Sequence, residues 1–488
     1  MESLFVEDDI LIRILLLLDV ISLKHMESAS VSFWCFTKRT KLWKKKFTEE
    51  QPNFFDNSTV SQDILHRERT SLSWDDHFKF KRLCLKYNSL GENWKNKNFI
   101  KKSFKISSKI GEDEKIMSMN SNFLLTTTKS QFFNTVKSVY DVNDCTALRT
   151  FEGGPRYQVL SADFTSEKVV MFGEEQLLGE SVSHNYDYNF CIKLYSRPSY
   201  QLVKPSVIFH EPEMSPWSRL RLCEDKIVVF VSNLQGKDLN RADSEDSVHI
   251  FSSTDTEQKY IKHLRKIVLC LPPKKYLSLF QFDSQHIIGC RKRNTLVEVW
   301  RLESSEPADT SWVAPVTWCK DVSYGNLIQC SSVLLEAPLA FIGKSNGRCD
   351  VWDCQLDVRL RSLVHGEANI ATDRPLLVSR ILLTQHYLLT LTSQGKTFLW
   401  DRLEAEQPTD SGLNMTDPVW TLPSLRGNKT QDVFCDETKL VTLESGLNPS
   451  NNSLVIYDFW HNKKKTNYVL NSKRSFSNNS NSKKRLCN

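Results

Sequence analysis

Two short glycine motifs in the second half of the chain have the residue types and spacing of catalytic loops. Residues 343–347, Gly-Lys-Ser-Asn-Gly, match the pattern that exposes a nucleophilic serine for acyl transfer when it forms a strand-to-helix turn. Residues 395–397, Gly-Lys-Thr, match the end of a phosphate-binding loop, but Thr390 stands where that loop needs its first glycine. The first motif ends five residues before Trp352, and the second begins five residues before Trp400. We therefore predict equivalent hairpin turns of a repeat, without catalytic residues.

Cysteine, histidine and arginine are the remaining candidates for chemistry. The 13 cysteines are scattered without a Cys-x-x-Cys pair, and no His-Glu-x-x-His sequence occurs. This pattern predicts no metal site and no disulfide framework, but buried thiols in a reducing compartment. Four arginines placed in loops are candidates for binding a phosphate group, with simple surface solvation as the alternative: Arg291, Arg293, Arg348 and Arg380. We expect no catalytic residue, no metal and no cofactor.

The positive charge of the chain is concentrated at its C-terminus. The formal net charge is +6, yet residues 461–488 carry eight Lys and Arg and no Asp or Glu, which leaves the first 460 residues at −2. Hydrophobic residues make up 40% and charged residues 25%, as in ordinary globular proteins. The apolar run from Ile10 to Leu18 is interrupted by Arg13 and is too short to span a membrane. We therefore expect a soluble intracellular protein that binds neither nucleic acid nor membrane.

Apolar segments that end in an aromatic residue recur along residues 105–460. The terminal aromatics lie 48 to 57 residues apart, at Tyr140, Tyr195, Phe251, Trp300, Trp352, Trp400 and Tyr457. A second short apolar run precedes each of them, and Gly, Asn and Ser turns separate the runs, which is typical of β-hairpins. We interpret the aromatics Trp300, Trp352 and Trp400 as core residues.

Seven such units of about four strands each predict a mainly β fold, a seven-bladed β-propeller. The units resemble WD repeats, most clearly in residues 347–353 and 395–401, although the Gly-His pair usual in that family is not found. Closing the last blade requires an outer strand from either Phe99–Ile106 or Tyr468–Leu470, and we favour the N-terminal segment.

The first 50 residues follow a helical period instead. Ile10, Ile14, Leu15 and Leu18 form a broad apolar stripe, and Ser22 is a candidate N-cap for a second helix. A third helix is predicted from about Ser30 to Thr40. Helices this short cannot bury enough apolar surface to be stable alone, and their excess of large apolar residues indicates a partner.

This module resembles an F-box, and the connector after it resembles the helical linker of F-box/WD-repeat proteins. The residues that carry the module's match are Ile10-Leu11, Ile14-Leu15, Leu18-Asp19, Leu23, Ser30 to Trp34 and Leu42-Trp43, with Val6-Glu7 in place of the family's opening Leu-Pro. Trp74, Arg82 and Asn93-Trp94 carry the match of the connector. The predicted order is an F-box-like module (1–50), a helical linker (51–104), the propeller (105–460) and a basic disordered tail (461–488).

The resemblance implies a non-catalytic substrate receptor of an SCF-type cullin–RING ubiquitin ligase. In that family the module docks on a Skp-family adaptor, and the propeller binds a target protein, phosphorylated in some relatives. The adaptor-binding residues implied here are Ile10, Leu11, Ile14, Leu15, Leu18, Leu23, Trp34, Leu42 and Trp43. The substrate-binding residues are left unassigned.

Several alternatives remain open at this point. The chain could be a WD-repeat scaffold without a ligase role or a nucleic-acid-associated propeller that uses the basic tail, or the N-terminal helices could simply cap the propeller. The basic run from Lys38 to Lys46 is interpreted as a solvated helix face. For the C-terminal tail, the alternatives are a solvating segment and a bipartite nuclear localisation signal.

Overall fold

The computed structural model describes residues 10–50, 76–106, 113–120, 123–129, 135–152, 157–165, 167–176, 188–196, 199–209, 219–223, 226–231, 247–253, 261–269, 279–282, 285–291, 295–302, 312–314, 316–321, 328–365, 376–407, 414–415, 417–422, 429–445 and 452–460. The chain divides into two compact units. One comprises Met1–Lys102 with Ile456–Asn488, and the other comprises Ser103–Val455.

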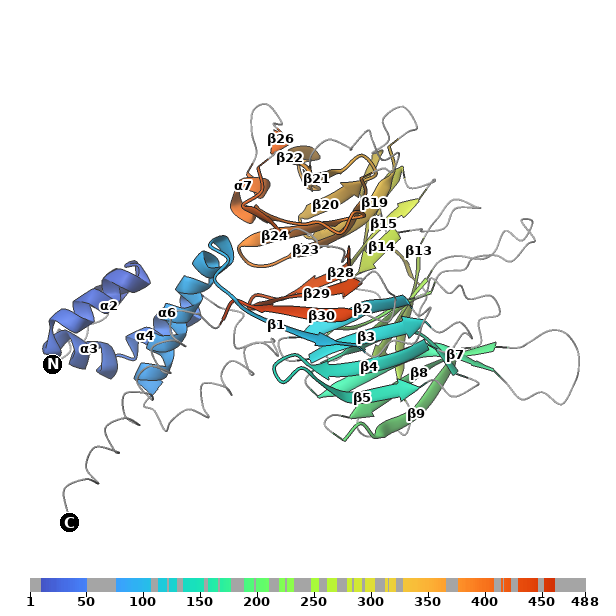
Figure 1. The fold of residues 1–488 in the computed structure, drawn as a ribbon, viewed down its shortest axis with the longest axis horizontal. Coiled ribbons are helices and arrows are strands. Elements are labelled where there is room, and N and C mark those ends of the chain that lie inside the picture. Colours follow the sequence, from blue (N-terminus) through green and yellow to red (C-terminus); the bar gives the residue numbers. More distant parts are fainter. Residues whose placement is uncertain are drawn as a thin grey trace, which may run out of the picture. The chain divides into compact units, whose positions relative to one another are not determined.

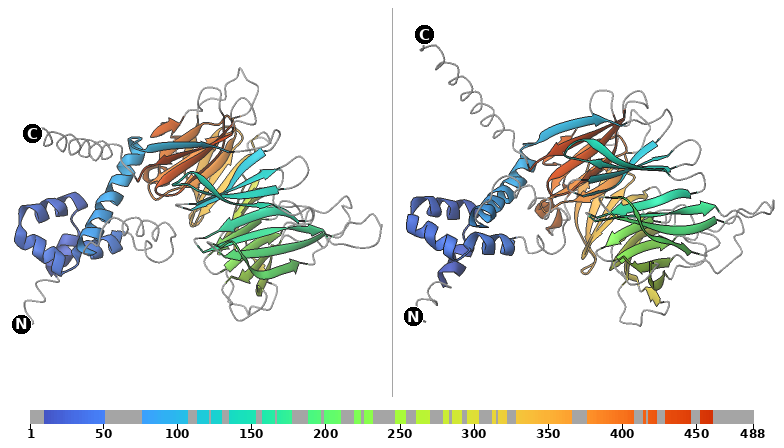
Figure 2. Two further views of the ribbon diagram at one scale, coloured as in Figure 1. Left: turned by 60° about the horizontal axis from the view of Figure 1, so that its bottom comes forward. Right: turned by 90° about the horizontal axis from the view of Figure 1, so that it is seen from below.

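Seven antiparallel sheets form a seven-bladed β-propeller, as predicted (Figures 1 and 2). The first blade contains β2 (Asp113–Asn120), β3 (Phe123–Lys129), β4 (Thr135–Asp141) and β5 (Thr146–Glu152). The second contains β6 (Tyr157–Phe164), β7 (Lys168–Gln176), β8 (Tyr188–Ser196) and β9 (Leu202–Phe209). The third contains β10 (Arg219–Cys223), β11 (Lys226–Val231), β12 (Ser247–Ser252) and β13 (His263–Leu269).

The remaining blades repeat this order. The fourth contains β14 (Leu279–Phe282), β15 (His286–Arg291), β16 (Leu296–Arg301) and β18 (Val316–Asp321). The fifth contains β19 (Cys330–Glu336), β20 (Leu339–Lys344), β21 (Arg348–Asp353) and β22 (Val358–Val364). The sixth contains β23 (Val378–Leu383), β24 (Tyr387–Thr392), β25 (Thr397–Asp401) and β27 (Trp420–Leu422), with helix α7 (Arg402–Glu406) after β25. The seventh contains β28 (Lys429–Cys435), β29 (Lys439–Ser445), β30 (Ser453–Asp458) and the N-terminal strand β1 (Ile100–Lys105), in the sheet order β1-β30-β29-β28.

Strand β1 is therefore the outer strand of the last blade, as we favoured from the sequence. It starts at Ile100, inside the segment predicted as linker. Two further short strands were not predicted. Strand β17 (Trp312–Ala314) pairs in parallel with β13, and β26 (Asn414–Met415) pairs in parallel with β22. Each comes from the loop before the last strand of one blade and extends the sheet of the preceding blade, so it ties two blades together.

The repeated aromatics all lie on the third strand of their blade. A register shift falls directly before the aromatic in five of the blades, between Val139 and Tyr140 and at the equivalent places before Tyr195, Phe251, Trp300 and Trp352. Where an Asp follows the aromatic, its carboxylate accepts backbone N–H groups of the next turn. Asp353 Oδ1, for example, accepts from Gln355 N at 2.8 Å and from Leu356 N at 2.9 Å. The Asp thus ends the strand and starts the turn.

The two glycine motifs are hairpin turns, as predicted. Gly347 and Gly395 have φ of +76° and +78°, a region that side chains rarely adopt. A Cβ at Gly395 would also lie 2.9 Å from backbone atoms of Thr430. Because each motif joins two strands of one blade, neither forms the strand-to-helix turn that a nucleophilic serine requires.

A buried histidine links the fifth blade to the sixth, and the sequence analysis missed it. His365 follows β22 and is followed, rather than preceded, by glycine. Its Nδ1 lies 2.8 Å from Gly347 O, its Nε2 lies 2.6 Å from Thr390 Oγ1, and Trp400 Nε1 donates to the same hydroxyl at 2.9 Å. Gly347 O can only accept, so Nδ1 carries the proton, and Nε2 accepts from Thr390. The sequence has no Gly-His pair here, so this contact between blades was not predicted.

Replacing His365 with Phe should flatten the pH dependence of propeller stability. Burial lowers the pKa of His365 to about 4, against an ordinary value of 6.5. Between these values the unfolded chain binds more protons, so the free energy of unfolding falls as the pH drops. From pH 7.5 to pH 5 the wild type should lose about 2 kcal/mol more than the variant, measured by urea unfolding. If the free energies of unfolding of wild type and variant changed equally with pH, His365 would not be a buried neutral histidine.

Four described helices and one shorter helical segment make up the N-terminal part. They are residues 10–16, α2 (Val20–Ala29), α3 (Val31–Arg39), α4 (Leu42–Glu50) and α6 (Asp76–Lys95). Helix α3 begins after Ser30, close to the predicted start. Helix α2 is capped by Asp19 and not by Ser22, because Asp19 Oδ1 accepts from the backbone N–H groups of Ile21 and Ser22 at 2.9 and 2.8 Å. The N-cap therefore lies three residues before the predicted one. The Asp19 carboxylate satisfies two backbone N–H groups that a hydroxyl at Ser22 could not reach. Trp74 and residues 461–488 lie outside the described residues.

Candidate functional site

The first helical segment has apolar side chains on two opposite faces. Ile12 and Leu15 point inward and are buried, whereas Ile10, Leu11 and Ile14 are exposed. Leu17, in the turn that follows, is 86% exposed. A helix that is apolar all round is normally buried on all sides, so the outward face lacks a covering surface within the described residues.

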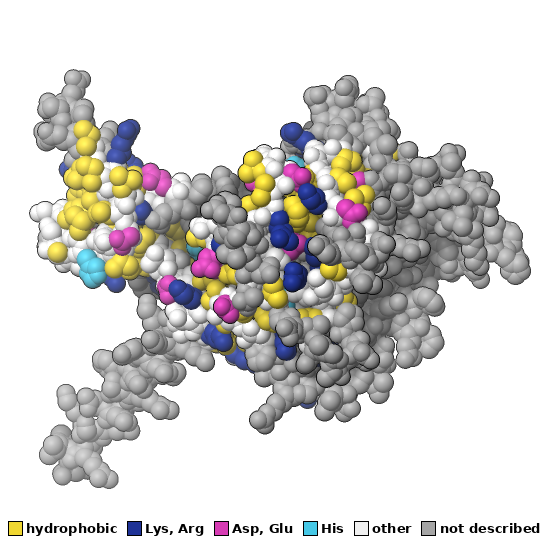
Figure 3. Space-filling view, turned by 90° about the horizontal axis from the view of Figure 1, so that it is seen from above, with side chains coloured by type: hydrophobic (Ala, Val, Ile, Leu, Met, Phe, Trp, Pro, Cys, Tyr) yellow, Lys and Arg dark blue, Asp and Glu magenta, His cyan; other side chains and the backbone are white. Residues whose placement is uncertain are grey.

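The exposed face continues from this segment onto α2. Ile10, Ile14, Leu17 and Ile21 are spaced by four, three and four residues, and Met26 adds a further exposed apolar side chain on α2. Figure 3 shows hydrophobic side chains gathered over the N-terminal helices. We call Ile10, Leu11, Ile14, Leu17, Ile21 and Met26 the outer face. Contiguous exposed apolar surface of this kind marks interaction sites.

The nine residues implied as adaptor-binding do not lie together on this outer face. Ile10, Leu11 and Ile14 belong to it, and Leu18 and Trp34 are half-buried. Leu15, Leu23, Leu42 and Trp43 are at most 2% exposed and form the core of the module. Buried side chains add no contact area to a partner surface while the helices keep this packing. Leu17, Ile21 and Met26 were missed, although their spacing from Ile10 and Ile14 was a usable signal.

A buried carboxylate organises the core of the module. Glu27 Oε1 accepts hydrogen bonds from Thr37 Oγ1 at 2.8 Å and from Trp43 Nε1 at 3.1 Å, and Glu27 Oε2 is paired with Lys81 of α6. Burial raises the pKa of Glu27, but the hydrogen bonds from Lys81, Thr37 and Trp43 outweigh it and leave the pKa below its usual value. Residues of α2, α3, α4 and α6 thus meet at one charged group.

The linker helix α6 is also held by the segment that follows β30. The ring of Trp94 stacks on Phe459 with centroids 3.8 Å apart, and Asn93 Nδ2 donates to Phe459 O at 2.9 Å. About two helical turns earlier, Tyr87 packs edge-on against Trp460. The connector residues Asn93 and Trp94, which carried the resemblance to a helical linker, are buried in this contact.

The basic run from Lys38 to Lys46 lies largely at the surface. Five of its six cations are exposed, and Lys46 is buried with its Nζ donating to Leu16 O at 2.7 Å. Lys38 Nζ lies 5.4 Å from the centroid of the Trp34 ring, and Arg39 Cζ lies 5.7 Å from that of Phe36. Two of the six cations thus form cation–π contacts with aromatic rings of the same helix.

On the propeller, the four candidate arginines do not form a cluster that the structure describes. Arg380 is paired with Asp432 and lies 5.6 Å from the centroid of the Phe434 ring. Arg348 is exposed at the start of β21. The side chain of Arg291 and the whole of Arg293 lie outside the described residues. Arg380 is therefore engaged in linking β23 to β28 and is not available to a phosphate group in this arrangement.

Among the described residues, no three His, Cys, Asp or Glu side chains are placed to hold a metal ion. None of the described helices combines the length and hydropathy needed to cross a bilayer.

Comparisons with known proteins add little to this geometry. No protein-family model matches the chain, and no curated protein matches it. One solved structure that resembles it is that of the computationally designed Ika8 protein, with 11% identity, coverage of 72% of this chain and 100% of that chain, and a TM-score of 0.41. A likeness at this level leaves the function to be argued from the chain itself.

Proposed function

We propose that the protein is a non-catalytic substrate receptor of an SCF-type cullin–RING ubiquitin ligase. The outer face docks on a Skp-family adaptor, and through it on the cullin–RING scaffold, while the propeller binds the target protein. The observation that carries the proposal is the outer face itself, which exposes six large apolar side chains on two successive short helices and the turn between them.

The mechanism in this proposal is burial of apolar surface at the docking site. The side chains of Ile14, Leu17 and Ile21 enter an apolar groove of the adaptor, as amphipathic helices do in helix-in-groove recognition. The exposed cations around the face, such as Arg13 and Lys24, would favour an adaptor surface with acidic groups at its rim.

The catalytic contribution is then positioning. A target held on the propeller is kept near the ubiquitin-conjugating enzyme, which raises the effective concentration of its lysine side chains.

Mixing the purified full-length chain with a purified Skp-family adaptor tests the proposal. We expect a one-to-one complex on size-exclusion chromatography and a dissociation constant below 1 µM by calorimetry, about 8 kcal/mol of binding free energy. If the adaptor does not bind a correctly folded chain, the ligase role is lost, and a propeller scaffold is the alternative that stands.

A further inference from the structure

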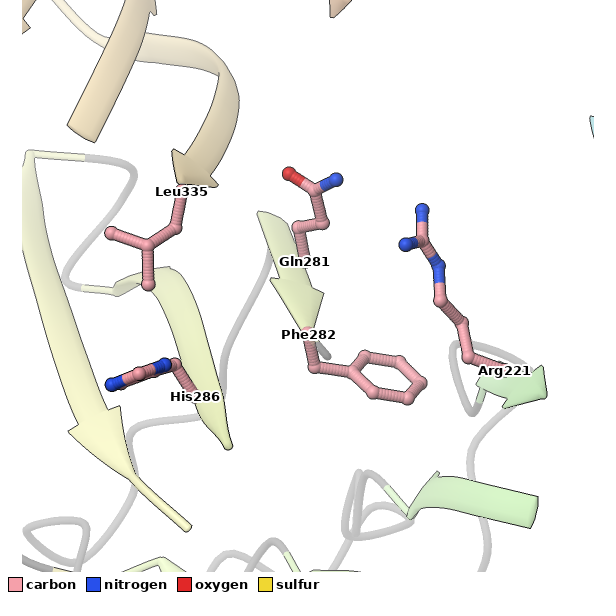
Figure 4. Close-up of a pocket in the computed structure, with 5 residues that line it drawn as sticks. All are labelled: Arg221, Gln281, Phe282, His286 and Leu335. Atoms are coloured by element: carbon pink, nitrogen blue, oxygen red, sulfur yellow. The ribbon is translucent and has the colours of Figure 1, made fainter. Parts of the chain in front are cut away.

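A small cavity lies between strands of three consecutive blades. Its volume is about 50 Å³, and it is lined by Arg221, Gln281, Phe282, His286 and Leu335 (Figure 4). Arg221 comes from β10, Gln281 and Phe282 from β14, His286 from the start of β15, and Leu335 from β19. The cavity thus belongs to the third, fourth and fifth blades.

Two polar groups in this cavity have no protein partner in the described part of the chain. Gln281 Oε1 is buried and accepts no hydrogen bond there. The Arg221 guanidinium is exposed and forms no hydrogen bond or ion pair with any described residue. Figure 4 shows both side chains extending in the same direction from neighbouring strands. A buried acceptor without a donor is costly in a folded protein, and it marks a place where a ligand can supply the missing N–H.

The size of the cavity limits the group that can enter it. A single water molecule needs about 10–15 Å³ by the same measure, so the cavity holds about three to five non-hydrogen atoms. A carboxylate with its attached carbon and the adjacent amide nitrogen has this size. A carboxylate also matches the planar donors of a guanidinium, which bind it through two parallel hydrogen bonds.

The charge on this side of β10 supports an anionic ligand. Arg219 lies two residues before Arg221, so the alternation of a strand places both on the same face. Burial lowers the pKa of Arg219, but an arginine stays protonated at any physiological pH. The apolar side chains of Phe282 and Leu335 line the rest of the cavity.

We infer that this cavity is a subsite for a peptide carboxylate that has an amide N–H next to it. The carboxylate pairs with Arg221, and the N–H donates to Gln281 Oε1. A phosphomonoester dianion offers only acceptors and would face the Gln281 carbonyl with no donor, so it fits less well. The carboxylate can come from a chain terminus or from an Asp or Glu side chain. If the proposed function holds, this peptide belongs to the target protein, and the subsite helps to select the target. The assignment of the peptide to a target therefore rests on the proposed function.

Ligand-observed saturation-transfer NMR on the full chain, without adaptor, tests this inference. The probes are N-acetylglycine, which carries a terminal carboxylate beside an N–H, N-acetylaspartate α-amide, which carries a side-chain carboxylate, and methyl phosphate, whose dianion has no O–H donor. We expect one or both carboxylates to bind in the millimolar range, and the stronger of the two identifies the source. Arg221→Ala should weaken this binding at least tenfold, and Gln281→Leu several-fold.

Arg359→Ala is the matched control, since Arg359 is exposed on the outer strand β22. It should bind as the wild type does, and all variants should keep the wild-type melting temperature. Preferential binding of methyl phosphate, absence of binding by both carboxylates, or equal binding by Arg221→Ala and wild type would each overturn the inference. Because no adaptor is present, a negative result here leaves the docking of the outer face untouched.

Discussion

Replacing both Ile14 and Leu17 with Asp should abolish adaptor binding while leaving the fold intact. These side chains are 53% and 86% exposed, so the free protein tolerates polar groups there. In the complex each Asp would place a carboxylate in an apolar groove. Central anchors of such interfaces contribute about 2 kcal/mol or more each, so the double variant should bind on the order of 1,000-fold more weakly. Calorimetry with the purified adaptor measures this loss.

Leu403→Asp is the matched control for this experiment. Leu403 lies on α7 of the propeller and is 70% exposed, so the substitution makes a similar chemical change away from the outer face. Its affinity for the adaptor should equal that of the wild type. Substituting the buried Leu15 or Trp43 would test the stability of the module and not its docking, because either change removes part of the module's core. An Ile14/Leu17 double variant with wild-type affinity would place the docking surface elsewhere.

Replacing Glu27 with Ala should unfold the N-terminal module selectively. The change removes the acceptor of Thr37 Oγ1 and Trp43 Nε1 and the ion-pair partner of Lys81. Removing one member of a buried charged network typically costs about 3 kcal/mol or more, a large share of the stability of a module this small. Hydrogen exchange followed by mass spectrometry should show loss of protection in α2, α3 and α4, with the propeller strands unaffected.

The pH dependence provides a second measure of the same network. The pKa of Glu27 is lower in the folded chain than in the unfolded chain, so its stabilisation is present above about pH 4.5 and is lost as the pH falls through the folded-state pKa. The stability difference between wild type and Glu27→Gln should therefore shrink below pH 4.5. Glu49→Ala, on the exposed side of α4, is the control and should change little. If Glu27→Ala and Glu49→Ala showed equal protection from hydrogen exchange in α2, α3 and α4, Glu27 would not organise the core of the module.

The propeller was predictable from sequence because its repeat involves large aromatic residues at one fixed place in each blade. Every aromatic from Tyr140 to Tyr457 lies on the third strand, and the recurring Asp after it ends that strand. The strands β17 and β26 were not predictable, since two or three residues carry no periodicity. His365 was missed because its Gly follows it, and its role depends on Thr390 in another blade.

The outer face was harder to predict for a different physical reason. Periodicity identifies an apolar stripe but not which of two stripes faces inward. In the first helical segment almost every position is apolar, so Leu15 and Ile14 looked equivalent although one is buried and the other exposed. The buried polar contacts of Glu27 depend on residues up to 54 positions away, which no local pattern reveals.

The closure of the seventh blade by β1 also sets an order of events during synthesis. Strand β1 leaves the ribosome about 350 residues before its partner β30 exists, a delay of roughly 20 to 70 s at ordinary elongation rates. Throughout this time its edge is open to pairing with other chains, and its exposed Lys101, Lys102 and Lys105 counter that aggregation. The N-terminal helices are synthesised long before β30. A partner could therefore bind them on the nascent chain before the last blade of the propeller is closed.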